Sequence, residues 1–317
     1  MKVLVIQQRY GIGDMVIFTP YFQAISKKLK IPLTILAKKT SRAEDLYSDD
    51  SHIEKIITLD STNDGLIGTF KLINQLKNEK FDKVFIFNNS FRYRIVTILA
   101  GIKEIFQYKM SLFKKNDIIF ETAKFFTENC LKEKVSPHAK IIFKDRDINN
   151  QKFKDFLKGD NKIIALGISA SGPTKRWDIK NYSKLIKKLS ESSKYKFILA
   201  GGKEDTNKIN QIINENENVS FFSLADMTIK DSLPVLKKAN AYIGNDTGFL
   251  HICAALGINS LGLFMDSPAY SYSGYSQKIN VVVPRNETLK STSHNTRGKN
   301  NISFDNVLEK SKEILST

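Results

Sequence analysis

The residues of this chain that could do chemistry fall in four short stretches, each joining a buried-type strand to a helix. They are Gly11-Ile-Gly-Asp14, Ser169 to Trp177, Gly201-Gly-Lys-Glu-Asp205 and Asn245 to His251. Ligands of parallel α/β sheets bind at the carboxyl ends of strands, which is where these stretches lie. Carboxylates there can take protons, while hydroxyls, cations and helix N-termini can bind phosphate. The sequence therefore predicts a site for an anionic, hydroxyl-rich ligand.

The last of these stretches joins the short apolar strand from Ala241 to an apolar helix. The turn between them predicts that Asp246, Thr247, Gly248 and His251 share one crevice at the strand end. A simpler alternative stays open, in which Asp246 or Thr247 only caps the helix and His251 is a core histidine.

The first stretch has the first two glycines of a dinucleotide-binding turn. Val16 stands where the third glycine would be, so a classical dinucleotide site is not expected. Gly11 and Gly13 allow a tight turn that leaves Asp14 at the helix start. From its position, Asp14 is either a helix cap or a catalytic base.

The loop from Ser169 to Trp177 resembles a phosphate loop without being one. Gly167 and Gly172 have the spacing of that motif, but Pro173 replaces its lysine. Its small hydroxyl residues and the Lys175-Arg176 pair could still bind a phosphate, or the loop could be an exposed turn. A carboxylate of Glu204 or Asp205 could accept hydrogen bonds from ribose hydroxyls. Alternatively, its negative charge only stabilises the N-terminus of the following helix through the helix dipole.

Strand and helix patterns alternate along the whole chain. This alternation predicts an α/β protein with doubly wound parallel sheets, and 317 residues suffice for two domains. Boundaries are expected at 1–155, 156–300 and 301–317, the last being an amphipathic helix that packs back toward the first domain. Asp145-Arg-Asp147 has the form of a DxD metal motif but no strand ends at it, so it is assigned to the linker.

The composition is typical of a folded protein, with 41% hydrophobic and 26% charged residues. No apolar run is long enough for a transmembrane helix or signal peptide, so a cytoplasmic location is expected. Cys130 and Cys253 indicate neither a disulfide framework nor a metal site.

The net charge of +16 favours an acidic partner. The sequence has no motif typical of nucleic-acid-binding proteins, so nucleic acid is not expected as a partner. Residues 103–135 interleave phenylalanine with lysine, as in a membrane- or acceptor-facing surface or a helix packed on the sheet.

Taken together, the four motifs resemble glycosyltransferase family 9, the bacterial lipopolysaccharide heptosyltransferases, from residue 1 to about 275. The resemblance implies a GT-B fold, with two Rossmann-like domains facing across a cleft. It implies inverting transfer of heptose from ADP-heptose to a lipid A–core acceptor, with no metal or other cofactor. It also implies a monomer that is peripheral to the anionic inner face of the membrane.

The family's site residues carry over to matching positions of this sequence. Asp14 falls on the general base, and Lys175 falls on the cation that faces the donor phosphates. The other donor-binding positions that carry over are Ser171, Glu204, Asp246, Thr247, Gly248 and His251. Ser169, Thr174 and Arg176 are further candidates for donor binding, and Gln8, Arg9, Tyr10 and Gly13 are candidates for acceptor binding.

Three departures from the family pattern bear on the substrates. Gln8 replaces a basic residue, Gly167-Ile-Ser169 replaces a frequent His-Pro-Gly, and Met265-Asp-Ser-Pro268 lacks the usual Gly-Pro-Thr-Asp-Pro form. Two alternatives therefore stay open. One is the same fold acting with another nucleotide-sugar in O-antigen or capsule synthesis, and the other is a non-catalytic saccharide- or nucleic-acid-binding protein.

Overall fold

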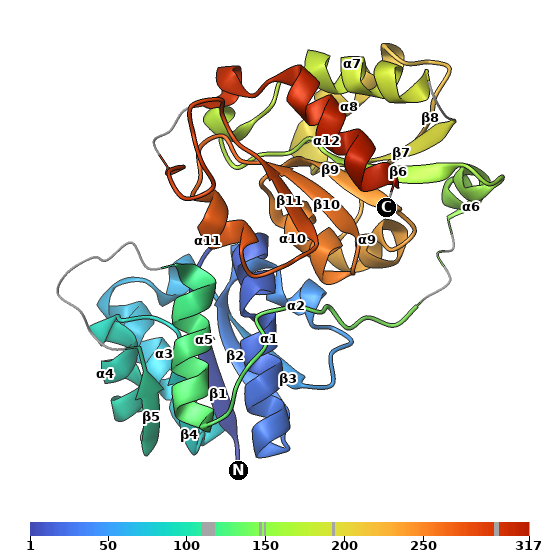
Figure 1. Cartoon of the computed structure of the whole chain (residues 1–317). Helices are drawn as coiled ribbons and strands as arrows, with labels where there is room; N and C mark the ends of the chain where they lie inside the picture. Colours follow the sequence, from blue (N-terminus) through green and yellow to red (C-terminus); the bar gives the residue numbers. More distant parts are fainter. Residues whose placement is uncertain (109–117, 146–147, 149, 192–193, 295–297, 317) are drawn as a thin grey trace. The chain divides into compact units, whose positions relative to one another are not determined.

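The structure is a computed structural model that describes the chain except residues 109–117, 146–147, 149, 192–193, 295–297 and 317. The chain folds as two compact units, Met1–Ile142 and Phe143–Thr317. Figure 1 shows a sheet flanked by helices in each unit. The predicted α/β class with two parallel sheets is confirmed.

The first unit is a doubly wound α/β fold with β1 at its centre. Among the described residues, its parallel sheet has five strands in the order β3-β2-β1-β4-β5. β1 is buried along its whole length, as expected for a continuous apolar run in a parallel sheet. Leu4 and Ile6 of β1 share a core with α3 and α4, while α1 packs against α5. In chain order its elements are β1 (Val3–Gln7), α1 (Ile12–Leu29), β2 (Leu33–Lys38), η1 (Lys39–Ser41), α2 (Ala43–Leu46), β3 (Ile53–Leu59), η2 (Ser61–Asn63), α3 (Gly65–Glu79), β4 (Lys83–Ile86), α4 (Phe91–Leu99), β5 (Glu104–Gln107) and α5 (Ile119–Leu131).

The second unit repeats this architecture around β9 and β6. In the part of the chain that the structure describes, its six parallel strands run in the order β11-β10-β9-β6-β7-β8. Its elements are α6 (Gln151–Leu157), β6 (Lys162–Gly167), η3 (Pro173–Lys175), α7 (Ile179–Ser190), β7 (Tyr195–Ala200), η4 (Lys203–Asp205), α8 (Thr206–Asn214), β8 (Ser220–Ser223), α9 (Ile229–Leu236), β9 (Ala241–Asn245), α10 (Gly248–Ala255), β10 (Asn259–Leu263), α11 (Ala269–Ser273), β11 (Ile279–Val282), η5 (Gly298–Asn301) and α12 (Phe304–Ser316).

The boundary between the units lies before the predicted one at 155. The reason is α6, which packs on β8 with the Phe153 and Phe222 ring centroids 4.8 Å apart and so belongs to the second unit. The C-terminal helix α12 packs on α7, β9 and β10, with Phe304 stacked on Trp177. Its predicted packing toward the first unit stays a prediction.

Part of the aromatic stretch at 103–135 packs on the sheet, while Phe125 is exposed. Phe106 of β5 stacks on Phe85 at 4.9 Å, and Phe126 of α5 meets Phe87 edge-on at 5.1 Å. Residues 109–117 of this stretch, and Arg146-Asp147 of the DxD sequence, lie outside the described residues. In the polar stretch 284–301, Gly298 donates a backbone hydrogen bond to Met265.

Candidate functional site

The central strands of the second sheet end side by side. Gly167 at the end of β6 pairs with Gly244 of β9, whose neighbour Asn245 pairs with Leu263 at the end of β10. The two glycines are required by close packing, because a Cβ on Gly244 would lie 2.5 Å from Gly167 backbone atoms. The loops that follow these strands therefore start from one place.

Asp246 lies in the turn after β9 and is held by two side chains. Its Oδ1 lies 3.3 Å from His251 Nε2, and its Oδ2 accepts a 2.6 Å hydrogen bond from Ser267 Oγ. Burial by itself would raise the pKa of Asp246. The hydrogen bonds from His251 and Ser267 and the charge of Lys175 outweigh it, so the pKa lies below its ordinary value. The carboxylate thus stays ionised at neutral pH.

His251, on the first turns of α10, is a core residue in its packing. It is only 2% exposed, and its Nδ1 lies 3.0 Å from the Tyr275 hydroxyl. Both ring nitrogens have partners inside the protein, so His251 orients Asp246 and Tyr275. Thr247 occupies the N-cap position of α10, yet its side chain makes no capping hydrogen bond. The capping alternative therefore does not account for the polar residues of this turn.

Asn245 fixes the loop that follows β6. Its Oδ1 accepts from the backbone N–H of Trp177 at 3.0 Å, and its Nδ2 donates to the carbonyl oxygens of Ile168 and Ser169 at 3.2 and 3.0 Å. Both ends of the loop from Ser169 to Trp177 are thereby tied to the end of β9. Asn245 is a positioning residue that the sequence analysis did not single out.

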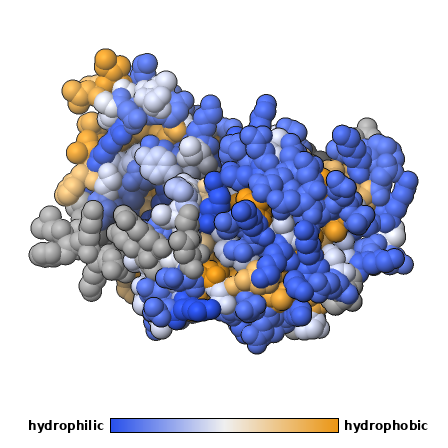
Figure 2. All heavy atoms as spheres, turned by 90° about the horizontal axis from the view of Figure 1, so that it is seen from above, coloured by the Kyte–Doolittle hydropathy of each residue, from blue (hydrophilic) through white to orange (hydrophobic). Residues whose placement is uncertain are grey.

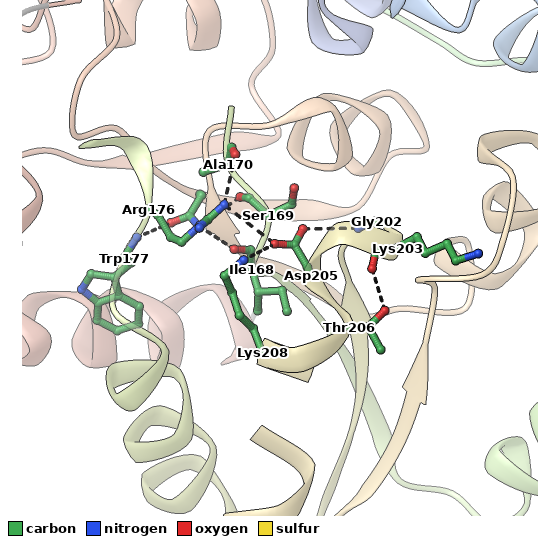
Figure 3. A network of polar contacts seen from close by, with 11 residues as sticks. Ile168, Ser169, Ala170, Arg176, Trp177, Gly202, Lys203, Asp205, Thr206 and Lys208 are labelled. Carbon is green, nitrogen blue, oxygen red and sulfur yellow. Dashed lines mark hydrogen bonds and ion pairs between the residues drawn. The ribbon is translucent and has the colours of Figure 1, made fainter. Parts of the chain in front are cut away.

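A buried carboxylate anchors Arg176 from the β7 side. Asp205 has no exposed surface, and its Oδ1 lies 2.7 Å from Lys208 Nζ and 3.8 Å from an Arg176 guanidinium nitrogen. Figure 3 shows these contacts, with Arg176 also reaching the carbonyl oxygen of Ala170. In the pair Glu204-Asp205, the buried acid is thus Asp205. Glu204 is exposed, and its carboxylate folds back over Gly202.

Thr174 and Lys175, in the short helix η3, are brought to the loop that follows β10. Thr174 Oγ1 donates to Asp266 Oδ2 at 2.6 Å. Lys175 is close enough to Asp246 for its charge to lower the pKa of that residue. Ser171 is exposed at the loop tip. The structure thus gathers Thr174, Lys175, Asp246 and His251 into one cluster and leaves Ser171 and Glu204 at its margin.

The loop after β10 supplies two residues that the sequence analysis missed, Asp266 and Ser267. Their signal was available, since this loop also follows a buried strand of the same sheet and its carboxyl end meets those of β6 and β9. It was noted only as a departure from a family motif. We call the group formed by Asn245, Asp246, Thr174, Lys175, Asp266 and Ser267 the strand-end cluster.

Asp14 lies in the first turn of α1, beside a cavity of the first unit. Its Oδ1 accepts from Arg9 Nε at 2.6 Å and its Oδ2 from the Gly11 backbone N–H at 3.2 Å. The N-cap residue is Gly11 and not Asp14, but the Asp14 carboxylate caps the first turn by accepting from the Gly11 backbone, and it also lines the cavity. Both roles are compatible, since capping fixes the position of the carboxylate. Gly13 is buried behind it.

The cavity measures about 1470 Å³ and lies at the carboxyl ends of β1, β4 and β5. Gln8, Arg9 and Tyr10 line it, and Lys38 Nζ lies 5.3 Å from the centre of the Tyr10 ring. The sequence analysis did not single out the polar lining residues Asn88, Asn89, Ser90, Arg92, Gln107 and Asn129. The aromatic lining residues are Phe87 and, from the stretch 103–135 that the sequence offered as a possible acceptor-facing surface, Phe106, Tyr108, Phe125 and Phe126. Amide side chains between aromatic walls suit a saccharide.

Comparison with known proteins assigns this architecture. A model of glycosyltransferase family 9 (heptosyltransferase) matches residues 69–301. The chain belongs to glycosyltransferase family 9. The match includes the whole strand-end cluster and begins after Asp14.

Individual relatives of this family 9 chain agree with the assignment. It is 27% identical over 263 residues to lipooligosaccharide heptosyltransferase 2 of Campylobacter jejuni subsp. jejuni serotype O:6, covering 80% of this chain and 78% of that one. Among solved structures, E. coli ADP-heptose LPS heptosyltransferase II superposes with a TM-score of 0.72 at 20% identity, covering 100% and 99% of the two chains. A family 9 glycosyltransferase from Veillonella parvula superposes with a TM-score of 0.78 at 16% identity, covering 99% and 97%. The chain is thus a glycosyltransferase of GT-B fold.

Several further features of this glycosyltransferase concern metals, thiols and membranes. In the described ranges, no group of three or more His, Cys, Asp or Glu residues is placed to hold a metal ion. Cys130 and Cys253 are free, and burial raises the pKa of Cys130 to about 11. No helix among the residues described is both long and apolar enough to cross a bilayer.

Proposed function

We propose that this glycosyltransferase transfers a heptose from ADP-heptose to an inner-core acceptor of lipopolysaccharide or lipooligosaccharide. The observation that carries the proposal is the family match, whose described activity is heptosyl transfer. Relatives named as heptosyltransferases of lipooligosaccharide and lipopolysaccharide support the acceptor class. A fold neighbour named for ADP-heptose supports the donor.

The strand-end cluster is the proposed donor site. Its loops begin at the carboxyl ends of β6, β9 and β10 and include the N-terminus of α10, which favours a phosphate group. Lys175 of the cluster and the neighbouring Arg176 supply positive charge for the phosphate groups. In the proposed reaction these cations stabilise the diphosphate as the bond from its oxygen to the anomeric carbon breaks, so that no metal ion is needed. Ser169, Ser171 and Thr247 are proposed to donate hydrogen bonds to the donor.

The proposed acceptor site is the cavity of the first unit, with Asp14 as the general base. An acceptor hydroxyl forms the new bond to the anomeric carbon while its proton passes to the Asp14 carboxylate, and ADP leaves. A single displacement of this kind inverts the anomeric configuration. Arg9 and the Gly11 N–H hold the carboxylate in one orientation.

Reconstitution tests this function directly. Purified protein is incubated with ADP-heptose and a core acceptor that lacks the terminal heptose. We expect release of one ADP and addition of one heptose per acceptor in the opposite anomeric configuration, without loss of rate in EDTA. Absence of transfer from ADP-heptose, with transfer from another nucleotide-sugar, would refute the donor assignment.

A second candidate is the same reaction with a different nucleotide-sugar, for O-antigen or capsule synthesis. The loops that depart from the family pattern favour it. They include Ser169, whose carbonyl oxygen is bound by Asn245, and Asp266 and Ser267, which belong to the strand-end cluster. Thermal-shift measurements with ADP, UDP and GDP separate the candidates. Stabilisation by UDP or GDP alone would support the second.

A further inference from the structure

The outer surfaces of α3 and α4 carry large apolar side chains where a helix of an α/β unit normally carries polar ones. These side chains are between 52% and 81% exposed, and most of the exposed large apolar residues in the described chain are among them. We call this surface the α3–α4 patch. It consists of Leu66, Ile67, Phe70, Phe91, Ile95, Ile98 and Leu99. Figure 2 shows hydrophobic residues gathered at the left edge of the molecule, over the side of the first unit that bears α3 and α4 in Figure 1.

The pattern within α4 is that of a helix placed between two apolar environments. Tyr93 and Val96 face the protein core, while Phe91 and Ile95 recur at a spacing of four on the exposed side. Apart from Arg92, Arg94 and Thr97, the residues of α4 are apolar on both sides, and such a helix is normally buried. Since the outward half of α4 is not covered by the described chain, it is suited to an apolar surface from outside.

The two helices form one continuous surface next to the cavity. Arg92 at the start of α4 binds the carbonyl oxygen of Asn63 and pairs with Asp64 at 3.8 Å, just before α3 begins. Arg92 and Asp64 also line the cavity. Asp64 directly precedes α3, and Arg92 is the second residue of α4. A surface bound to the patch would therefore lie beside the opening of the cavity.

The charge around the patch is basic. Lys71, Arg94 and Lys103 lie on or directly after the same helices, and the whole chain has a net charge of +16. Nearby acids are paired, Asp64 with Arg92 and Glu104 with Lys83. Exposed apolar side chains with basic residues on the same helices are the features with which peripheral proteins bind anionic bilayers. A second copy of this chain fits less well, because an isologous contact would bring the same cations face to face.

We propose that the α3–α4 patch is the surface by which the protein binds an anionic lipid membrane, with its apolar side chains inserted at the headgroup level. This inference rests on the proposed function in one respect: an acceptor linked to lipid would present its saccharide at that same level. The cavity of the first unit would then open beside the membrane surface that carries the acceptor.

Vesicle sedimentation of the full chain tests the proposal without donor or acceptor. The probes are vesicles of phosphatidylethanolamine with phosphatidylglycerol, and vesicles of phosphatidylcholine alone. The variant is Ile67→Gln, Phe70→Gln and Ile95→Gln combined, since glutamine is a good helix former and none of the three lines the cavity. The matched control is Leu289→Gln, an exposed apolar residue of the second unit.

We expect wild type and the control to bind the anionic vesicles, with affinity that falls as salt rises, and the triple variant to bind at least about tenfold more weakly. A Lys71→Gln, Lys103→Gln variant should bind more weakly and lose much of the salt dependence. Melting temperatures should agree among all variants, so that unfolding does not explain the loss. Equal binding by the triple variant, or none by wild type, would overturn the proposal.

Two further readouts separate the alternatives. Gel filtration showing a wild-type dimer that the triple variant converts to a monomer, without vesicle binding by either, would assign the patch to self-association and refute the proposal. Transfer to a deacylated, water-soluble acceptor should be unchanged in the triple variant, while transfer to vesicle-embedded acceptor should fall. If neither protein transfers heptose but wild type alone binds vesicles, the proposed function fails and the membrane surface stands.

Discussion

Asp14 is the side chain on which the proposed chemistry depends most. Asp14→Asn keeps one acceptor oxygen, so it can accept from either Arg9 or Gly11 but not from both, and it cannot take the proton of the acceptor hydroxyl. We expect kcat to fall by about 10²–10⁴, the usual contribution of a general base, with little change in melting temperature. The control is Asp45→Asn, which alters another Arg–Asp pair of the first unit, 2.9 Å long and away from the cavity. Turnover close to wild type in Asp14→Asn would refute the assigned base.

Lys175 is the cation proposed to face the leaving diphosphate. Lys175→Gln should lower kcat/KM by about 10²–10³, as does loss of one donor from an oxyanion site, because the charge is needed as the leaving group forms. Steady-state kinetics against ADP-heptose measure this. Lys188→Gln serves as control, since Lys188 makes an exposed ion pair with Glu191 on α7. A similar loss in both variants would show that Lys175 has no special role.

Asp246 gives a prediction about stability and pH. Its pKa in the folded protein is lowered, because the hydrogen bonds from His251 and Ser267 and the charge of Lys175 outweigh burial, which by itself raises it. The pKa of an aspartate in an unfolded chain is about 3.9. Ionised Asp246 therefore stabilises the fold above that pH, and its contribution is lost as the pH falls through the folded pKa.

Asp246→Asn should accordingly lower the free energy of unfolding by about 1–3 kcal/mol at neutral pH. The difference from wild type should shrink below about pH 4. Urea denaturation at several pH values measures both. A difference that is constant with pH, or that grows in acid, would contradict the ionised pairing.

Among the strands, the contact of β6 with β9 is the element that positions the strand-end cluster. A Cβ at Gly244 would meet Gly167 backbone atoms at 2.5 Å, whereas a Cβ at Gly172 has nothing within 4 Å. Gly172 also has an extended backbone that any residue adopts. We expect Gly244→Ala to lower the free energy of unfolding by about 1–3 kcal/mol and Gly172→Ala to leave it nearly unchanged, by urea denaturation. Equal effects would mean that the strand contact is not tight.

The strands and most helices could be predicted because apolar runs of parallel sheets and the alternation with amphipathic helices are strong local signals. β5 gives no such signal, because Glu104–Gln107 is a short, half-exposed edge strand without a clear pattern. Asp14, Lys175 and Asp246 were found because each follows a buried strand. The roles of Asn245 and Asp266 could not be read locally, since they depend on strand register and on hydrogen bonds to distant loops.

For the chain as a whole, the division into two units determines how a ligand should affect unfolding. All residues of the strand-end cluster belong to the second unit. ADP should therefore raise the free energy of unfolding of that unit by about 2.7 kcal/mol at a hundredfold excess over its Kd, and so raise its melting temperature. Calorimetry with ADP, UDP and GDP measures this. Stabilisation of the first unit alone by ADP would contradict the placement of the donor site.

The most direct test of heptosyl transfer is mass spectrometry of the core oligosaccharide from cells that lack this protein. We expect a core oligosaccharide that lacks one heptose. Expression of the wild-type chain should restore this heptose, and expression of the Asp14→Asn variant should not. An unaltered heptose content in the deletion strain, or loss of a sugar other than heptose, would contradict the proposed activity.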